Sequence, residues 1–227
     1  LGLLFEAAIS GGHAIAPATL VKGGMGALTQ SLLEAARSAG VEIRTGADVR
    51  RVQVARNRAT GVVLASGEEI PASAVVSNAD PRHTFLGLVD PVELDPDFLM
   101  KIGNYRCRGS AAKVNLALSG LPRFDAADSS GTECIAGRIH IGPETDSLER
   151  AFDAAKYGDY SPSPLMEITI PSITDPELAP SGAHVMSIYV QYAPYEFKSG
   201  DWSSRREQFG DVVVDALSGY APNVREL

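Results

Sequence analysis

A run of glycines at residues 23 to 26 is the part of the sequence best suited to chemistry. Gly23, Gly24 and Gly26 surround Met25, directly before a stretch with helical spacing. Glycines allow close approach to the backbone, and the first amides of a helix lie at its positive end. This pattern is typical of a loop that binds an anionic or polar ligand group. A tight loop packed against the protein itself is the alternative, because short glycine runs are common in turns.

The histidines and cysteines form no metal-binding or catalytic pattern. No HExxH, CxxC, GxSxG or Walker sequence occurs, so metalloenzyme, hydrolase and nucleoside-triphosphatase interpretations have no support. Each histidine is interpreted as a surface or packing residue. Two cysteines are too few for a disulfide framework, and together with the lack of a secretory leader they predict a reducing cytoplasm. The four histidines are His13, His83, His140 and His184, and the two cysteines are Cys107 and Cys134.

The composition predicts a globular protein that binds no nucleic acid. The 227 residues are 44% hydrophobic and 21% charged, and the net charge is −8. A nucleic-acid surface would be basic and clustered, and no run of 18 apolar residues predicts a membrane span. Residues 1–80 are neutral, whereas residues 81–227 carry the whole excess of acid. The shift falls at the turn sequence Asn78-Ala79-Asp80-Pro81, which predicts a boundary there.

The periodicity of apolar residues predicts a mixed fold of helices and strands. Helical spacing occurs at 28–39, 84–88, 96–102, 148–156 and 205–217. Strand patterns occur at 41–45, 49–54, 61–65, 110–118, 165–170 and 185–192, with a short strand at Ile70 and a buried one at 74–77. The turns at 56–60 and 66–69 are of hairpin length, which favours antiparallel pairing. The predicted fold class is therefore α/β (α+β), with a mixed, largely antiparallel sheet and flanking helices.

Both ends of the sequence lie inside patterned segments. The chain opens with apolar residues from Leu1 and stops at Leu227, just after a helical pattern. Residues 1–9 are too short and too acidic for a signal peptide. We therefore expect this chain to be an excised piece of a longer protein.

Six short segments follow one another in an order that resembles a known family. They are GGMGAL at 23–28, GVEI at 40–43, ADV at 47–49, GV at 61–62, GEEI at 67–70 and AVVSNADP at 74–81. The series is similar to the middle of FAD-dependent oxidoreductases of the phytoene desaturase and carotenoid isomerase group, within the flavin amine oxidase superfamily. The resemblance is best over residues 23–120, and beyond residue 120 only the pattern agrees.

The resemblance implies a two-domain flavoenzyme that binds FAD. Residues 1–80 would contribute to the FAD-binding domain, and residues 81–227 to the sheet-based substrate-binding domain. The family holds the FAD diphosphate with a GxGxxG unit and adds a C-terminal glycine-rich flavin segment. Neither occurs here. Both absences fit the excised piece, and they argue against FAD binding by this chain alone.

The resemblance also implies roles for individual residues. The backbone of Val49 would pair with the adenine edge of FAD, although a core valine explains the residue equally well. Asn78 and Ala79 would end a buried strand beside the cofactor, or simply form a turn. Gly23 to Gly26 would lie near the boundary of flavin and substrate. Lys113 resembles the lysine that holds a water near flavin N5, whereas alternation alone predicts a solvated lysine.

The family implies hydride transfer from a substrate C–H to flavin N5. An elongated, apolar small molecule would fit a desaturase or isomerase, and the low aromatic content of 7% disfavours an amine cage. The alternative function is a non-catalytic binding or scaffold module that kept the fold without the cofactor. A third reading is a piece that folds but has no activity by itself. Apolar surface left by removed segments would favour a homo-oligomer.

Overall fold

The computed structural model describes residues 21–127, 131–142 and 144–227. The chain divides into two compact units. The larger unit contains the described part of Leu1–Glu34 together with Gly109–Leu227, and the smaller unit is Ala35–Arg108. These units divide the chain at other residues than the predicted boundary at residue 80. Which unit contributes to which functional domain stays a prediction.

The larger unit is built on a four-stranded antiparallel sheet in the order β4-β7-β6-β5. The strands are β4 (Ala111–Leu118), β5 (Ile139–Ile141), β6 (Leu165–Thr169) and β7 (His184–Gln191). The longest pairing joins β4 to β7, from Ala111 opposite Gln191 to Leu118 opposite His184. The two central strands, β6 and β7, are therefore paired on both sides, and their core-facing apolar residues are buried more deeply than those of the edge strands β4 and β5.

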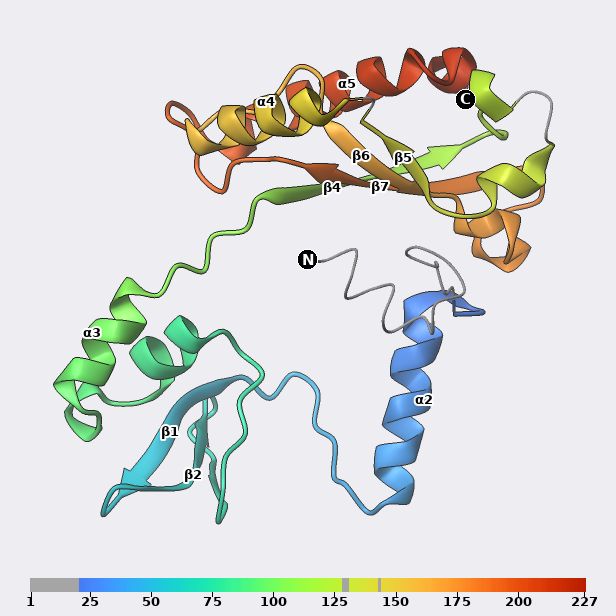
Figure 1. Ribbon diagram of the computed structural model, residues 1–227. Coiled ribbons are helices and arrows are strands. Elements are labelled where there is room, and N and C mark those ends of the chain that lie inside the picture. The colour runs from blue at the N-terminus through green and yellow to red at the C-terminus, as the bar shows by residue number, and fades with distance from the viewer. Residues whose placement is uncertain (1–20, 128–130, 143) are drawn as a thin grey trace. The chain divides into compact units, whose positions relative to one another are not determined.

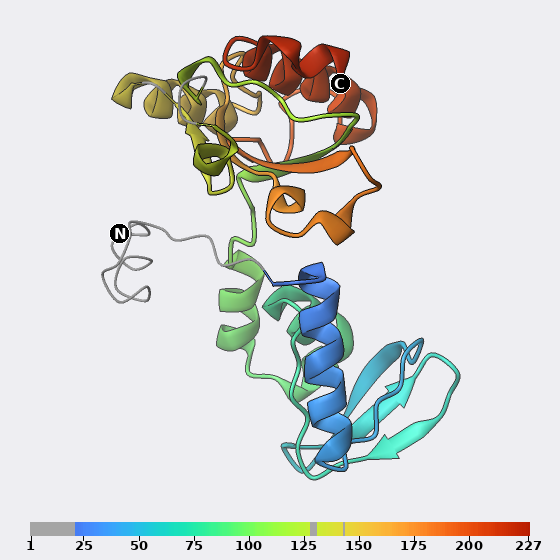
Figure 2. The ribbon, with the colours of Figure 1, turned by 90° about the vertical axis from the view of Figure 1, so that its right-hand side faces the viewer.

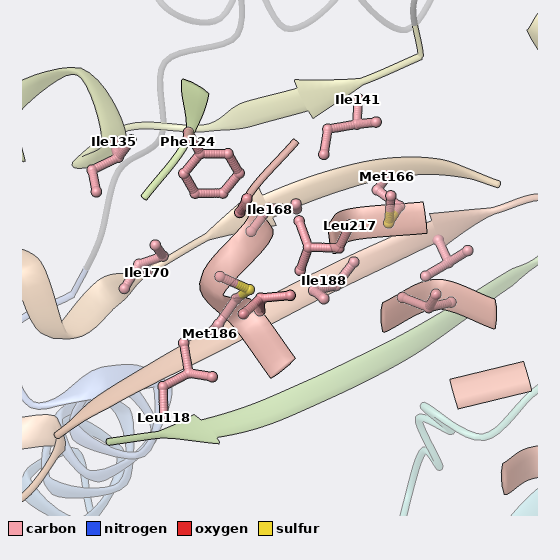
Figure 3. Close-up of a cluster of buried hydrophobic side chains, with 14 of the residues drawn as sticks. Leu118, Phe124, Ile135, Ile141, Met166, Ile168, Ile170, Met186, Ile188 and Leu217 are labelled. Atoms are coloured by element: carbon pink, nitrogen blue, oxygen red, sulfur yellow. The ribbon is translucent and has the colours of Figure 1, made fainter. Parts of the chain in front are cut away.

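Helices cover one face of this sheet. These are α4 (Thr145–Lys156) and α5 (Trp202–Ser218), which both views place on the same side (Figures 1 and 2). Phe209, Val213 and Leu217 recur at a spacing of four along α5 and are all buried. They pack in one cluster with alternate residues of the strands, including Ile168 and Ile188, which are fully buried (Figure 3).

The smaller unit contains a three-stranded antiparallel sheet in the order β1-β2-β3. Its strands are β1 (Val49–Ala55), β2 (Arg58–Leu64) and β3 (Glu69–Pro71). Arg56 and Asn57 form the first turn with positive φ values of 51° and 60°, as the commonest two-residue hairpins require. A π-helical segment, His83–Leu88, and α3 (Pro96–Asn104) follow, and Phe85 packs edge-on against Phe98 with the ring centroids 4.9 Å apart.

The remaining elements are one helix and several short turns. Helix α2 (Gly24–Ser38) begins in the larger unit and ends in the smaller one. The 3₁₀ turns are Pro91–Glu93, Asp125–Ala127, Thr132–Ile135, Pro171–Ile173, Pro176–Leu178 and Pro222–Glu226. Within the described residues, no helix combines the length and the apolar character that a membrane span requires. The predicted mixed fold with antiparallel sheets is confirmed.

The strand predicted at residues 41–45 is wrong. The amide of Val41 donates to the carbonyl of Ala36, and the amide of Gly40 donates to that of Arg37. This is the double hydrogen bond that closes a helix around a glycine with positive φ, so Val41 completes the end of α2 instead of joining a sheet. In the same segment, the guanidinium of Arg44 donates hydrogen bonds to the carboxylates of Glu68 and Glu42. These bonds, the one to Glu68 most of all, raise the pKa of Arg44.

The buried strand predicted at residues 74–77 is also wrong. None of the described strands pairs with this segment, and Val76 is 96% exposed. The last ladder contact before it is the bond from the amide of Ala72 to the carbonyl of Thr60. An apolar run becomes a strand only where a neighbouring strand supplies its hydrogen bonds, and the sequence pattern does not report the neighbour.

The packing of the core predicts that shortening a side chain at the centre of the larger unit strongly lowers its stability. Ile188→Ala is expected to lower the free energy of unfolding by about 2–5 kcal/mol, because it leaves a cavity beneath α5. Urea unfolding followed by circular dichroism measures the change. Leu148→Ala, whose side chain is 46% exposed, is the matched control and should change stability far less. Equal effects of the two substitutions would contradict the packing described.

The start of α5 predicts a stability contribution that depends on pH. The Asp201 carboxylate accepts a hydrogen bond from the amide of Ser204 at 2.9 Å, and this bond lowers the pKa of Asp201. Because the folded pKa lies below the unfolded one, the stabilisation is present above the unfolded pKa and is lost as pH falls through the folded pKa. Asp201→Ala should therefore lower the melting temperature at neutral pH, with a difference that shrinks in acid. Asp211→Ala, in the same helix but not at its start, is the control and should lower the melting temperature at neutral pH far less.

Candidate functional site

The predicted glycine loop lies at the start of α2. Gly23 and Gly24 have φ values of +78° and +77°, a backbone conformation that residues with a Cβ rarely adopt. The amide of Gly23 donates to Oδ2 of Asp175 at 2.5 Å, and a Cβ on Gly24 would lie 3.4 Å from Leu178. The glycines therefore serve at least a packing role, because they bring the backbone against the turn at Asp175–Leu178.

Asp175 changes the electrostatics of this loop. Its side chain is buried, and its carboxylate occupies the position at the helix start where an anion would be stabilised. A ligand phosphate at the Gly23 amide would therefore meet a negative charge. Sequence reasoning missed Asp175, because no pattern links it to a loop that precedes it by 152 residues. A ligand-binding role for Gly23, Gly24, Met25 and Gly26 stays a prediction.

Lys113 lies in β4 on the face of the sheet opposite to the core. Its neighbours Ala112 and Val114 pack against the core cluster, whereas Lys113 is exposed. Tyr189 of β7 stands directly opposite Lys113, and Glu167 of β6 stands opposite Tyr189. Paired residues in an antiparallel sheet project from the same face, with Cβ atoms about 4.5–5.5 Å apart. The structure thus places polar side chains beside Lys113 that sequence reasoning did not connect with it.

Val49 begins β1 in the smaller unit and is half-buried. Its partner Leu64 directs its own amide to the carbonyl of Glu68, away from β1, while the adjacent pair Ala65 and Asp48 is hydrogen-bonded. In the alternating antiparallel pattern, the backbone groups of Val49 therefore point to the outer edge of β1. None of the described strands pairs with that edge. A donor and an acceptor are thus available at Val49, as pairing with a planar ring edge would require.

Asn78 and Ala79 lie in the turn before the π-helical segment and not at the end of a strand. The amide of Ala79 donates to Oγ of Ser77 at 3.3 Å, and Ser77 Oγ lies 2.8 Å from Oγ1 of buried Thr84. Ala79 also lines a largely apolar cavity of about 420 Å³ together with Val75 and Phe85. The turn interpretation of this sequence is therefore the one that the geometry matches, and a cofactor role for Asn78 and Ala79 stays a prediction.

The predicted site residues fall in both units. The glycine loop and Lys113 belong to the larger unit, and Val49, Asn78 and Ala79 belong to the smaller one. Among residues 21–127, 131–142 and 144–227, no cluster of histidine, cysteine or acidic side chains could hold a metal ion. Cys107 and Cys134 are free and exposed, and His184 contacts Ser172 Oγ through Nδ1 at 3.0 Å. His13 lies outside the described residues.

The fold is shared with a solved structure. A solved oxidoreductase from Methanosarcina mazei superposes with a TM-score of 0.59 at 17% sequence identity. The match covers 87% of this chain and 39% of that chain. At this identity the comparison concerns the fold alone.

The sequence comparisons identify the family. The model of flavin containing amine oxidoreductases matches residues 4–222, so this chain belongs to that family. A mouse protein, pyridine nucleotide-disulfide oxidoreductase domain-containing protein 2, is 38% identical over 90% of this chain and 37% of its own length. An all-trans-zeta-carotene desaturase from Myxococcus xanthus is 26% identical over 91% of this chain and 38% of its own length. The chain thus spans about two fifths of the relatives that it matches.

The contact of Gly23 with Asp175 generates a prediction. Asp175→Ala removes the acceptor and should lower the free energy of unfolding by about 1–3 kcal/mol, with faster hydrogen exchange of the Gly23 amide. Asp175→Asn keeps an oxygen acceptor and should restore much of the protection. Thermal melting and amide exchange by NMR measure both effects. Unchanged exchange at Gly23 in Asp175→Ala would contradict a structural role for the carboxylate.

Proposed function

We propose that this chain is the central, substrate-domain-bearing part of an FAD-dependent oxidoreductase that acts on a small molecule. The family match over residues 4–222 carries the proposal. The identity of 26% to a carotene desaturase supports a dehydrogenase or desaturase type of reaction. Because the chain spans about two fifths of its relatives, the whole activity depends on segments beyond those described, and the chain alone is expected to be inactive.

Two features of the chain fit a flavin nucleotide. The outward backbone donor and acceptor of Val49 suit the edge of an adenine ring. The ammonium group of Lys113, exposed on the open face of the sheet, suits a position where negative charge develops. The glycine loop does not fit the diphosphate, since Asp175 already accepts from the Gly23 amide. We therefore assign the diphosphate to parts of the protein outside this chain.

The chemistry divides between cofactor and protein. When bound, FAD supplies the hydride acceptor, its N5 atom, for a hydride that leaves a substrate C–H. Lys113 would hold a water molecule by hydrogen bonds and stabilise negative charge close to that position. The sheet that carries Lys113 would form one wall of the substrate site and exclude water from it. This division needs no metal ion and no nucleophilic residue from the described part of the chain.

The visible spectrum after incubation with FAD and desalting tests the proposal. The full-length protein should retain flavin absorbance, whereas this chain alone should lose most of it because we assign no diphosphate site to its described residues. A full-length protein that emerges colourless would contradict the oxidoreductase and support a scaffold module that kept the fold without the cofactor.

The assignment of Lys113 predicts a selective kinetic defect. In the FAD-loaded protein, Lys113→Met should slow reoxidation of the reduced flavin by about tenfold or more, because a preorganised cation is removed. FAD affinity should be unchanged, since the proposed FAD contact lies at Val49. Stopped-flow absorbance measures both quantities. Lys156→Met, in the helix on the other side of the sheet, is the matched control, and equal rates in the two variants would contradict the role of Lys113.

A further inference from the structure

The open face of the larger sheet carries polar side chains in two neighbouring rows. One row crosses all four strands and the next crosses three of them. The rows are Lys113, Tyr189, Glu167 and His140, followed by Asn115, Ser187 and Thr169. In the second row, Ser187 Oγ donates to Oδ1 of Asn115 at 3.1 Å, so this pair is already hydrogen-bonded. The first row is the one that carries charged side chains.

The first row carries an excess positive charge. The Glu167 carboxylate pairs with the guanidinium of Arg138, with 3.3 Å between NH1 and Oε2. Lys113 has no ion pair or hydrogen bond to any other residue that the structure describes. One cation therefore remains uncompensated on this face, although residues 81–227 carry a net charge of −8. In an acidic protein, this row is a local site of attraction for an anion.

Tyr189 stands between Lys113 and Glu167 in the first row. Lys113 is its neighbour on one side, and Glu167, with its partner Arg138, is its neighbour on the other. The side chain is 42% exposed, and its hydroxyl has no hydrogen-bond partner among the described residues. Polar side chains alone would not indicate a binding site, because a sheet face that is simply exposed to water is also polar. Here, however, a free phenol donor and a free cation stand side by side, and the fold makes no use of either.

We propose that this face binds the substrate of the oxidoreductase through a carboxylate group, which accepts a hydrogen bond from Tyr189 in the positive field of Lys113. The inference rests on the proposed function and names its substrate class, a small organic acid. It departs from the apolar substrate that the family resemblance implied. A hydrocarbon on this face would strip water from Lys113 and from the Tyr189 hydroxyl without replacing the lost hydrogen bonds.

Three probe molecules of similar shape distinguish the contributions of charge, of polarity and of apolar contact to the binding affinity. Benzoate carries the carboxylate, benzamide replaces it with a neutral polar group, and toluene replaces it with a methyl group. Ligand-observed NMR titration of the FAD-incubated, full-length protein measures each affinity. We expect benzoate to bind about tenfold more tightly than benzamide and toluene to bind most weakly, because hydrogen bonds to a charged acceptor are the stronger ones.

Tyr189→Phe removes only the hydroxyl and should weaken benzoate binding about five- to tenfold, with toluene binding unchanged. Tyr220→Phe is the matched control: Tyr220 is 40% exposed and lies beside Ala216 of α5, the helix on the core side of the sheet. It should leave all three affinities unchanged. Melting curves of both variants check that the fold is retained.

The outcomes separate this inference from the proposed function. Equal binding of toluene and benzoate, or benzoate binding that ignores Tyr189→Phe, would overturn the carboxylate site even if flavin is retained. Benzoate binding that depends on Tyr189 in a protein without flavin absorbance would support the site and contradict the oxidoreductase. Weaker benzoate binding at higher ionic strength would further support the role of Lys113.

Discussion

The burial of one sheet face beneath α5 is the constraint on which the larger unit depends. Phe209, Val213 and Leu217 recur on one side of the helix, and the alternate residues of β6 and β7 meet them in a single core cluster. Because side chains alternate across a strand, this burial also decides what lies on the other face. Packing Ile188 inward places Tyr189 outward, and packing Val114 inward places Lys113 outward. The candidate site is a geometric consequence of the core.

The glycine loop illustrates how one pattern can serve two purposes. A glycine-rich helix start is suited to an anion, and here the buried carboxylate of Asp175 supplies one from within the chain. The contact joins the start of α2 to the turn at Asp175–Leu178, and it ties a segment far away in the sequence to the larger unit. The amide of Gly23 is thereby satisfied without a ligand. A ligand-binding role for the loop as a whole stays a prediction.

Family membership and the details of the chain carry different kinds of information. The match over residues 4–222 shows that this chain belongs to the family of flavin containing amine oxidoreductases, but relatives that it matches include proteins named for different reactions. The polar first row on the open sheet face is a feature of the residues themselves. Its one uncompensated cation and its free phenol point to an acidic substrate, whereas the family alone suggested an apolar one. The substrate class that we propose therefore rests on the chemistry of the site residues, because similarity to the family does not specify it.

Local patterns in the sequence determined most of the elements. The helices α2, α3 and α5 and the strands β1, β2, β4, β6 and β7 follow from periodicity and from the glycine and proline residues that bound them. The ordered motifs around residues 23–81 were sufficient to indicate the family. These features depend on neighbouring residues, so they can be read along the chain. The short segments at 41–45 and 74–77 were misassigned, because a strand exists only where another strand pairs with it.

The tertiary structure decided which residues meet. Alternation placed Lys113 on the polar side of its strand, but only the pairing of β4 with β7 brought Tyr189 beside it, and only the pairing of β7 with β6 placed Glu167 next in the same row. Likewise, no local signal connected Gly23 with Asp175. Strand order, register and contacts between distant segments are set by how the apolar faces pack together, and that packing depends on the whole chain at once. The sequence alone therefore determined the elements and the family, and the packing of the core determined the site.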